Sequence, residues 1–254
     1  MPELLRWDAP GPYEVVFSTR TGGVSEGPYE SLNLGLLTAD DPRHVAENRR
    51  ILCSATGTDP SRLALNRQLH GATVNRARAG GREPRGDALW TEEACLPLLV
   101  LAADCIPVVL VRTDGEPALA VVHAGRLGIL AGLLDAATRA IGGRLTAAIG
   151  PGAGPCCYEV GDDVAAEYRA RFGGGIVRGR RLDLWGAAET ALHEAGVERV
   201  HRFDRCTICD PVHFFSHRRD RGVTGRQGVL AVIRAADGQV RRARAADERT
   251  QPSS

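Results

Sequence analysis

Three residues of this 254-residue chain have the types and settings of a catalytic metal site. His70 stands in Gln-Leu-His-Gly, Cys105 in Ala-Ala-Asp-Cys-Ile-Pro and His123 in Val-Val-His-Ala-Gly, each after an apolar stretch. Small residues follow both histidines and leave space beside the imidazole rings. Two imidazoles and one thiolate are a common catalytic zinc set, with a fourth position open for water. An ion held in this way makes water a nucleophile near neutral pH.

Spacing alone does not separate this interpretation from structural burial of the same residues, because the three are far apart in sequence. Asp104 adds a functional argument, since a carboxylate between an apolar stretch and Cys105 is costly to bury without a partner. It is a candidate general base or proton shuttle, or a residue that orients a ligand. An ordinary turn aspartate is the alternative.

A second group of potential ligands follows near the C-terminal end: Cys206, Cys209, His213 and His217. Its two halves are closer together than those of a usual zinc finger. A loop in which Arg218 and Arg219 face an anionic group is therefore the favoured interpretation. The adjacent pair Cys156-Cys157 is expected to be structural, because neighbouring cysteines rarely ligate one ion well.

The composition limits the chemistry and the partners. All 32 basic residues are arginines, which excludes a Schiff-base lysine and a P-loop lysine. An anion must be held by arginine or by backbone N–H groups. The candidate substrate contacts are Arg20, Asn33, Arg126, Arg218 and Arg219. Net charge is +1 without a clustered basic face, so no nucleic-acid partner is expected.

The N-terminus lacks the basic and apolar regions of a signal peptide, and no apolar run is long enough to span a bilayer. We therefore expect a cytoplasmic protein without a membrane partner. Its seven cysteines are then expected to be reduced thiols or metal ligands.

The periodicity of apolar residues predicts an α+β fold: a single-domain mixed α/β sandwich with a hairpin-rich sheet and flanking helices. An Asp-Gly pair between two apolar runs predicts a hairpin. Residues 1–234 are expected to form one catalytic domain and 235–254 a flexible C-terminal tail. The expected helices are 42–56, 128–141, 162–172 and 184–195. The expected strands are 15–18, 63–74, 98–103, 107–112, 118–123, 145–149, 197–203 and 229–233. The Gly- and Arg-rich stretch 77–85 is expected to be a loop.

Taken together, several motifs resemble one family. They include Ser-Thr-Arg-Thr-Gly-Gly from Ser18, Ser-Leu-Asn-Leu-Gly from Ser31, Asp-Ala-Leu from Asp87, Cys-Tyr-Glu-Val-Gly from Cys157, Phe-Phe-Ser-His-Arg-Arg-Asp from Phe214 and Thr-Gly-Arg-Gln from Thr224, beside the three already quoted. In this order they resemble the bacterial laccase-domain family, also described as polyphenol oxidases and as purine nucleoside phosphorylases with adenosine deaminase activity. The resemblance runs from about residue 15 to residue 233.

The resemblance implies zinc on His70, Cys105 and His123 in a cytoplasmic enzyme. It also implies phosphorolysis of adenosine, inosine, guanosine or methylthioadenosine, with deamination of adenosine as a second reaction. One motif departs from the family pattern, where Trp-Arg-Gly usually follows His-Ala-Gly. Here Arg126-Leu127-Gly128 follows, which bears on substrate preference more than on the metal.

Three other functions remain open from the residues alone. A copper-dependent oxidase is disfavoured because there is no His-x-His pair and Met1 is the only methionine, although a site of two histidines and one cysteine can take copper in vitro. A hydrolase with Cys105 as nucleophile and a histidine base, such as one that edits peptidoglycan precursors, is compatible with the trio. A zinc-binding module without catalysis is the third. The oligomeric state is not predicted.

Overall fold

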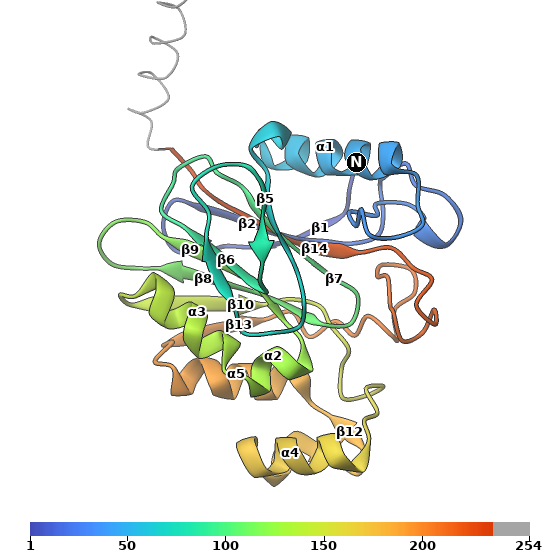
Figure 1. The fold of residues 1–254 in the computed structure, drawn as a ribbon, viewed down its shortest axis with the longest axis vertical. Helices are drawn as coiled ribbons and strands as arrows, with labels where there is room; N and C mark the ends of the chain where they lie inside the picture. Colours follow the sequence, from blue (N-terminus) through green and yellow to red (C-terminus); the bar gives the residue numbers. More distant parts are fainter. Residues whose placement is uncertain (236–254) are drawn as a thin grey trace, which may run out of the picture.

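Two six-stranded sheets face each other in the computed structural model, which describes residues 1–235, with only the backbone described at Arg82 and Glu83 (Figure 1). The first sheet has the order β1 (Leu4–Trp7), β2 (Tyr13–Ser18), β14 (Gln227–Ile233), β7 (Leu98–Ala102), β3 (Ala64–Arg67) and β5 (Gly81–Arg85). The second has the order β13 (Arg199–Arg202), β10 (Leu145–Ile149), β8 (Ile106–Arg112), β9 (Leu119–Ala124), β6 (Ala88–Thr91) and β4 (Val74–Arg76).

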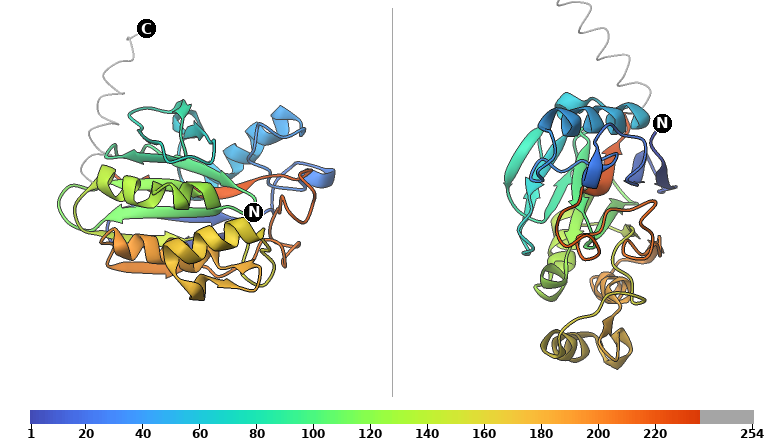
Figure 2. Two further views of the ribbon diagram at one scale, coloured as in Figure 1. Left: turned by 60° about the horizontal axis from the view of Figure 1, so that its bottom comes forward. Right: turned by 90° about the vertical axis from the view of Figure 1, so that its right-hand side faces the viewer.

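Helices cover the outer faces of both sheets. The helix α1 (Pro42–Thr56) packs on the first sheet, where Leu52 meets Val16 and Leu230. The second sheet is covered by α2 (Arg126–Leu130), α3 (Leu133–Ile141), α4 (Asp162–Phe172) and α5 (Leu184–Glu194), which lie on one side of the molecule in Figure 2. A short hairpin of β11 (Val177–Arg178) and β12 (Arg181–Leu182) and the 3-10 turns η1 (Gly27–Tyr29), η2 (Pro60–Arg62) and η3 (Gly174–Ile176) complete the described elements.

The core between the sheets contains residues from both, among them Phe17 and Val100 from one sheet and Val109 and Val121 from the other. Strand β9 is buried along its whole length and β8 along all but its last residue, because the other sheet covers one face and helices cover the opposite one. This explains why both read as continuous apolar runs rather than as alternating patterns. The predicted sandwich of mixed sheets and flanking helices is confirmed.

The structure corrects four details of the prediction. The expected strand 63–74 ends after Arg67 and leaves His70 in a loop, at a φ of 62°. The expected helix 128–141 is two helices, because Gly132 interrupts it at a φ of 79°. The Gly- and Arg-rich stretch 77–85, expected to be a loop, contains β5, and the strands β1, β6, β11 and β12 were not predicted.

The C-terminal tail expected from residue 235 lies, apart from Ala235 itself, outside the described residues. Its flexibility and the single catalytic domain over 1–234 stay predictions. Among residues 1–235, no helix is long and apolar enough to cross a membrane.

Candidate metal centre

His70, Cys105 and His123 come together, although they lie in three separate segments. Their potential ligand atoms are all within 4.8 Å of one another. The rings of His70 and His123 meet edge to face, with centroids 4.8 Å apart. His70 is in the loop between β3 and β4, Cys105 is in the turn that connects β7 with β8, and His123 is in β9. The trio therefore lies where the chain crosses from the first sheet to the second.

The hairpin of β8 and β9 places two of the three ligands. Its register sets Pro107 opposite His123 and Ile106 opposite Ala124, so Cys105 is next to the end of the ladder. The turn of this hairpin contains Gly115, at a φ of 64°, as the predicted Asp-Gly signal requires. Local turn chemistry thus brings the cysteine and the second histidine to the same end of the sheet.

Asp87 organises both histidines, although the sequence analysis named it only as part of a family motif. Its buried carboxylate is 1% exposed and lies 2.9 Å from Nδ1 of His123. The same carboxylate accepts hydrogen bonds from the backbone N–H groups of Leu69, His70 and Gly71. Because an ionised carboxylate only accepts, Nδ1 of His123 is protonated and Nε2 remains for a metal ion. The sequence contained a signal for this role, because Asp87 directly precedes the mostly buried strand β6 and a carboxylate there is costly to bury without partners.

Gly125 leaves the ligands room to converge. A Cβ atom at this position would be 3.1 Å from Cδ2 of His70 and 3.2 Å from Sγ of Cys105. Any side chain would therefore press on two of the three ligands. This is the physical reason for the glycine in His-Ala-Gly.

The half-buried Cys105 and the buried His123 form a charged pair. Burial raises the pKa of the Cys105 thiol, but the positive charge of His123 and hydrogen bonds from both histidines lower it from 9.0 to about 6. Burial lowers the pKa of His123, while Cys105 and Asp87 together raise it from 6.5 to about 9. At neutral pH the metal-free chain therefore holds a thiolate beside an imidazolium. A thiolate is the form of cysteine that ligates metals.

Asp104 adjoins the site but its oxygens are engaged. Oδ1 accepts a hydrogen bond of 2.7 Å from the Thr207 hydroxyl, and Oδ2 accepts one of 2.6 Å from the backbone N–H of Arg218. The residue is 9% exposed and has a φ of 84°. These contacts tie the loop of Cys105 to the loops of Thr207 and Arg218. They are the contacts of a positioning residue, and the proton shuttle stays a prediction.

Two of the predicted arginines, Arg126 and Arg218, act on Tyr158, whose phenol the Cys105 charge also reaches. The Arg218 guanidinium is 5.2 Å from the ring centroid of Tyr158. Burial and the Cys105 charge raise the pKa of the Tyr158 phenol, whereas the charges of Arg126 and Arg218 oppose that rise. Arg126 opens the helix α2, and Tyr168 donates a hydrogen bond to its carbonyl. Arg126 and Arg218 therefore place positive charge around the Tyr158 phenol, which the Cys105 charge also reaches.

The other three predicted substrate contacts serve the loops around the site. Arg20 donates to the carbonyls of Glu30 and Pro211. Arg219 pairs with Asp220 and donates to two backbone carbonyls. Asn33 is fully buried, and its amide group bonds to Thr38, Asp40 and two backbone N–H groups. A substrate role for these three residues stays a prediction.

Arg226 is a further cation that the sequence analysis did not single out. Burial lowers the pKa of its guanidinium, against the raising effect of the Asp104 and Cys105 charges. Its Nη1 donates to the carbonyls of Thr224 and Gly225. The Thr-Gly-Arg-Gln motif that contains it was quoted only as part of the resemblance.

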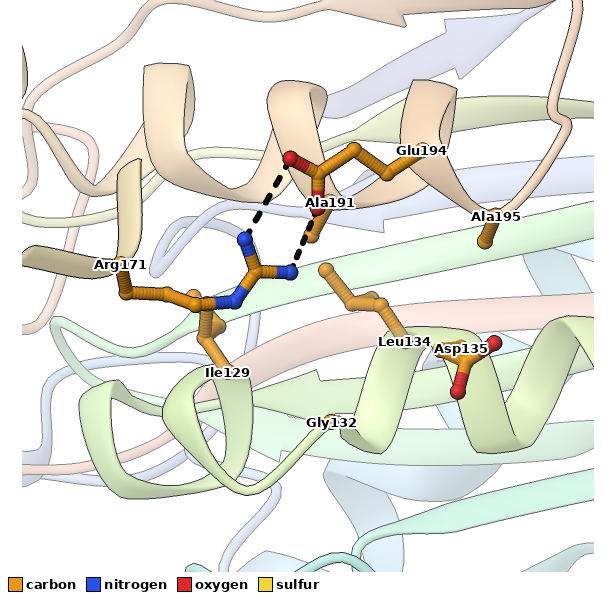
Figure 3. A pocket seen from close by; sticks show the side chains of 8 residues that line it. All are labelled: Ile129, Gly132, Leu134, Asp135, Arg171, Ala191, Glu194 and Ala195. Atoms are coloured by element: carbon orange, nitrogen blue, oxygen red, sulfur yellow. Dashed lines mark hydrogen bonds and ion pairs between the residues drawn. The ribbon is translucent and has the colours of Figure 1, made fainter. Parts of the chain in front are cut away.

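A hollow of about 280 Å³ in the helix layer is separate from this chemistry (Figure 3). Ile129, Leu134 and Ala191 line it, and the ion pair of Arg171 with Glu194 crosses one side. None of the metal-ligating trio lines it. A second hollow of about 330 Å³ adjoins Arg20 and Val212 and is likewise not lined by the trio.

The second predicted ligand group separates in the structure. Cys206 and Cys209 converge with Cys156 and Cys157, and not with the two histidines. His213 pairs with Asp210 through Nδ1 at 2.8 Å, and His217 is exposed. The two cysteines and the two histidines therefore do not form one ligand group, and the anion-facing role of Arg218 and Arg219 stays a prediction.

The fold and the trio define a two-sheet α/β sandwich with a histidine–cysteine–histidine group suited to a metal ion. A family model described as multi-copper polyphenol oxidoreductase laccase matches residues 14–234. The chain belongs to this family, which confirms the resemblance predicted from the motifs.

Curated relatives cover most of the chain. The purine nucleoside phosphorylase Cgl2154/cg2365 of Corynebacterium glutamicum is 38% identical over 85% of this chain and 92% of its own length. The purine nucleoside phosphorylase YfiH of Escherichia coli is 36% identical over 87% of this chain and 94% of its own length. Among solved structures, YlmD of Geobacillus stearothermophilus has a TM-score of 0.85 at 33% identity, over 91% of this chain and 96% of that one.

Proposed function

We propose that this chain is a zinc-dependent purine nucleoside phosphorylase that also deaminates adenosine. Its substrates would be adenosine, inosine, guanosine and methylthioadenosine, and its location the cytoplasm. The main support is the convergence of His70, Cys105 and His123 within 4.8 Å, in a family whose curated relatives are named purine nucleoside phosphorylases.

The donor set fits zinc. A thiolate and two neutral imidazoles match its ligand preference, and the pKa of Cys105 near 6 supplies the thiolate at neutral pH. Asp87 fixes the tautomer of His123, as carboxylates commonly do behind zinc-ligating histidines. When bound, zinc would supply Lewis acidity at the trio. Copper is expected to compete with zinc in vitro, because it binds such donors more tightly.

Phosphorolysis breaks the bond between C1′ of the ribose and a purine nitrogen and forms a bond from C1′ to a phosphate oxygen. The phosphate needs cations, and this chain offers only arginine guanidiniums. Arg126 and Arg218 fit this task best, because their charges reach the Tyr158 phenol, which the Cys105 charge also reaches. The guanidinium of Arg218 also donates to the Glu159 carbonyl, next to Tyr158 in the chain. Arg226 is the third candidate, since it is half-buried and the charges of Asp104 and Cys105 reach it.

The test is product analysis on chain purified without added metal. We expect about one zinc ion in the trio, and adenine with ribose-1-phosphate from adenosine plus phosphate. Inosine formed from adenosine would report the deaminase. Cys105→Ala should remove both the ion and the products, whereas Cys95→Ser, at an exposed cysteine, should keep them. Purine products that persist in Cys105→Ala would refute the role of the trio.

One observation favours a second function, that of a hydrolase with Cys105 as its nucleophile. Asp87, His123 and Cys105 form a linked series, with His123 hydrogen-bonded to both partners. A nucleophilic cysteine with a histidine base and an orienting carboxylate is a hydrolase arrangement. Chelation distinguishes the two functions, because a cysteine hydrolase would keep its activity, or gain some, when the zinc is removed. A zinc enzyme would lose activity and recover it with added zinc.

A further inference from the structure

Four cysteines converge outside the site described above. The sulfur atoms of Cys156, Cys157, Cys206 and Cys209 all lie within 4.8 Å of one another. Sγ of Cys209 is 2.9 Å from that of Cys157 and 3.2 Å from that of Cys156. Two of the thiols are exposed and two are half-buried, so an ion can reach them from solvent.

The sheet topology brings these four thiols together. Strands β10 and β13 are parallel neighbours, so the loops that follow them leave the same edge of the sheet. Backbone bonds then join the two loops, since Gly152 donates to the Arg205 carbonyl and accepts from the Thr207 N–H. The cysteines are thus held close by backbone structure that does not depend on the thiols.

We propose that this tetracysteine cluster binds a thiophilic divalent ion, zinc in the cell, as a structural site separate from the His70–Cys105–His123 centre. Tetrahedral zinc with bonds of about 2.3 Å sets its four sulfurs about 3.8 Å apart. The four sulfurs already lie within 4.8 Å of one another, and that of Cys209, 2.9 Å from that of Cys157, would move away from it by roughly 1 Å when the ion binds. Cys206 and Cys209 have the two-residue spacing that zinc sites use. Cys156 and Cys157 are adjacent, a spacing expected from the sequence to ligate one ion poorly, but the structure places both of their sulfurs within 4.8 Å of the other two. The N–H of Gly154 donates to Sγ of Cys206 at 3.3 Å, the kind of outer contact that orients a metal-bound thiolate.

The chemistry distinguishes this site from the first. Four thiolates fill the coordination shell and leave no open position, which is the mark of a structural zinc site. Binding transfers the thiol protons to solvent, without an oxidant or reductant. The ion would cross-link the two loops that carry Tyr158 and Thr207. Since Thr207 donates to Asp104, the cross-link would stiffen the wall next to Cys105.

The test counts zinc in four reduced chains purified without added metal: wild type, Cys105→Ala, Cys206→Ser/Cys209→Ser and Cys95→Ser. We expect about two ions per chain in wild type and in Cys95→Ser, and about one in each of the other two. A thermal scan should also show a lower Tm for the double variant than for Cys95→Ser. Cys95 is a matched control because it is an exposed thiol outside both groups.

An ion count in the double variant equal to that of wild type overturns the proposal, as does a disulfide among the four cysteines of the isolated wild type. A zinc count that falls in Cys105→Ala and not in the double variant would support the His70–Cys105–His123 centre and overturn the proposed tetracysteine site. If the double variant fails to fold, X-ray absorption of Cys105→Ala decides. Its remaining ion should have only sulfur neighbours at about 2.3 Å, and a shell that contains nitrogen overturns the proposal.

Discussion

The two ligand groups of this molecule are built in different ways. The His70–Cys105–His123 centre stands at strand ends and is backed by the buried carboxylate of Asp87. The tetracysteine cluster stands on two loops with two of its thiols exposed. The first arrangement prepares charge and tautomer before an ion arrives, as a catalytic site requires. The second offers only convergent thiols, which suffices for an ion that holds loops together.

The sharpest difference between the two groups is expected in thiol ionisation. In metal-free, reduced chain the pKa of Cys105 is about 6, whereas a hydrogen bond with Cys157 raises the pKa of Cys209 to about 11. At pH 7 the thiolate fractions should therefore differ by about four orders of magnitude. Alkylation followed across pH by mass spectrometry should give midpoints near these two values. Equal midpoints for Cys105 and Cys209 would contradict the expected difference. His123→Asn should raise the midpoint of Cys105 and leave that of Cys209 unchanged.

The same pKa shifts fix the expected pH dependence of folding. The lowered pKa of Cys105 stabilises the fold above the unfolded value of 9.0, and this contribution is lost as the pH falls through 6. The raised pKa of His123 stabilises the fold below the unfolded value of 6.5, and this contribution is lost as the pH rises through 9. Between about 6.5 and 9, both folded and unfolded chains hold one proton on this pair. This pair should therefore cause almost no change of the free energy of unfolding with pH between about 6.5 and 9. Urea titration of metal-free chain at several pH values measures this.

The next largest effect concerns Asp87, which has no counterpart in the tetracysteine cluster. Asp87→Asn should weaken zinc binding or activity by about 10- to 100-fold, because His123 loses the acceptor that fixes its tautomer. A competition titration with a chelator measures the affinity of the first site, and the ion of the tetracysteine cluster should stay bound. Asp135→Asn, at an exposed carboxylate on α3, is the control. Equal zinc affinity in the two variants would contradict the role of Asp87.

The sequence predicted local elements better than it predicted contacts between distant segments. The apolar runs and the Asp-Gly turn were enough for the hairpin that places Cys105 and His123, because those contacts are local. The break at His70 could not be seen, since its cause is the carboxylate of Asp87 bonding three backbone N–H groups from another segment. Cys206 was grouped with nearby histidines, whereas its partners lie about fifty residues upstream and arrive through a parallel strand pairing. Non-local contacts of this kind leave no periodic signal in the chain.

The smallest of these effects uses one glycine from each region. Gly125→Ala places a methyl group 3.1 Å from a His70 carbon and 3.2 Å from the Cys105 sulfur, so it should lower zinc affinity about tenfold. Gly154→Ala meets the ring of Trp185 at 2.7 Å, so it should lower the free energy of unfolding by about 1–3 kcal/mol instead. Gly174→Ala, which meets no atom within 4 Å, is the control for both. Chelator competition and urea unfolding measure the two quantities. If Gly125→Ala changed stability and left affinity intact, the first site would be shaped by the surrounding fold rather than by contact with its ligands.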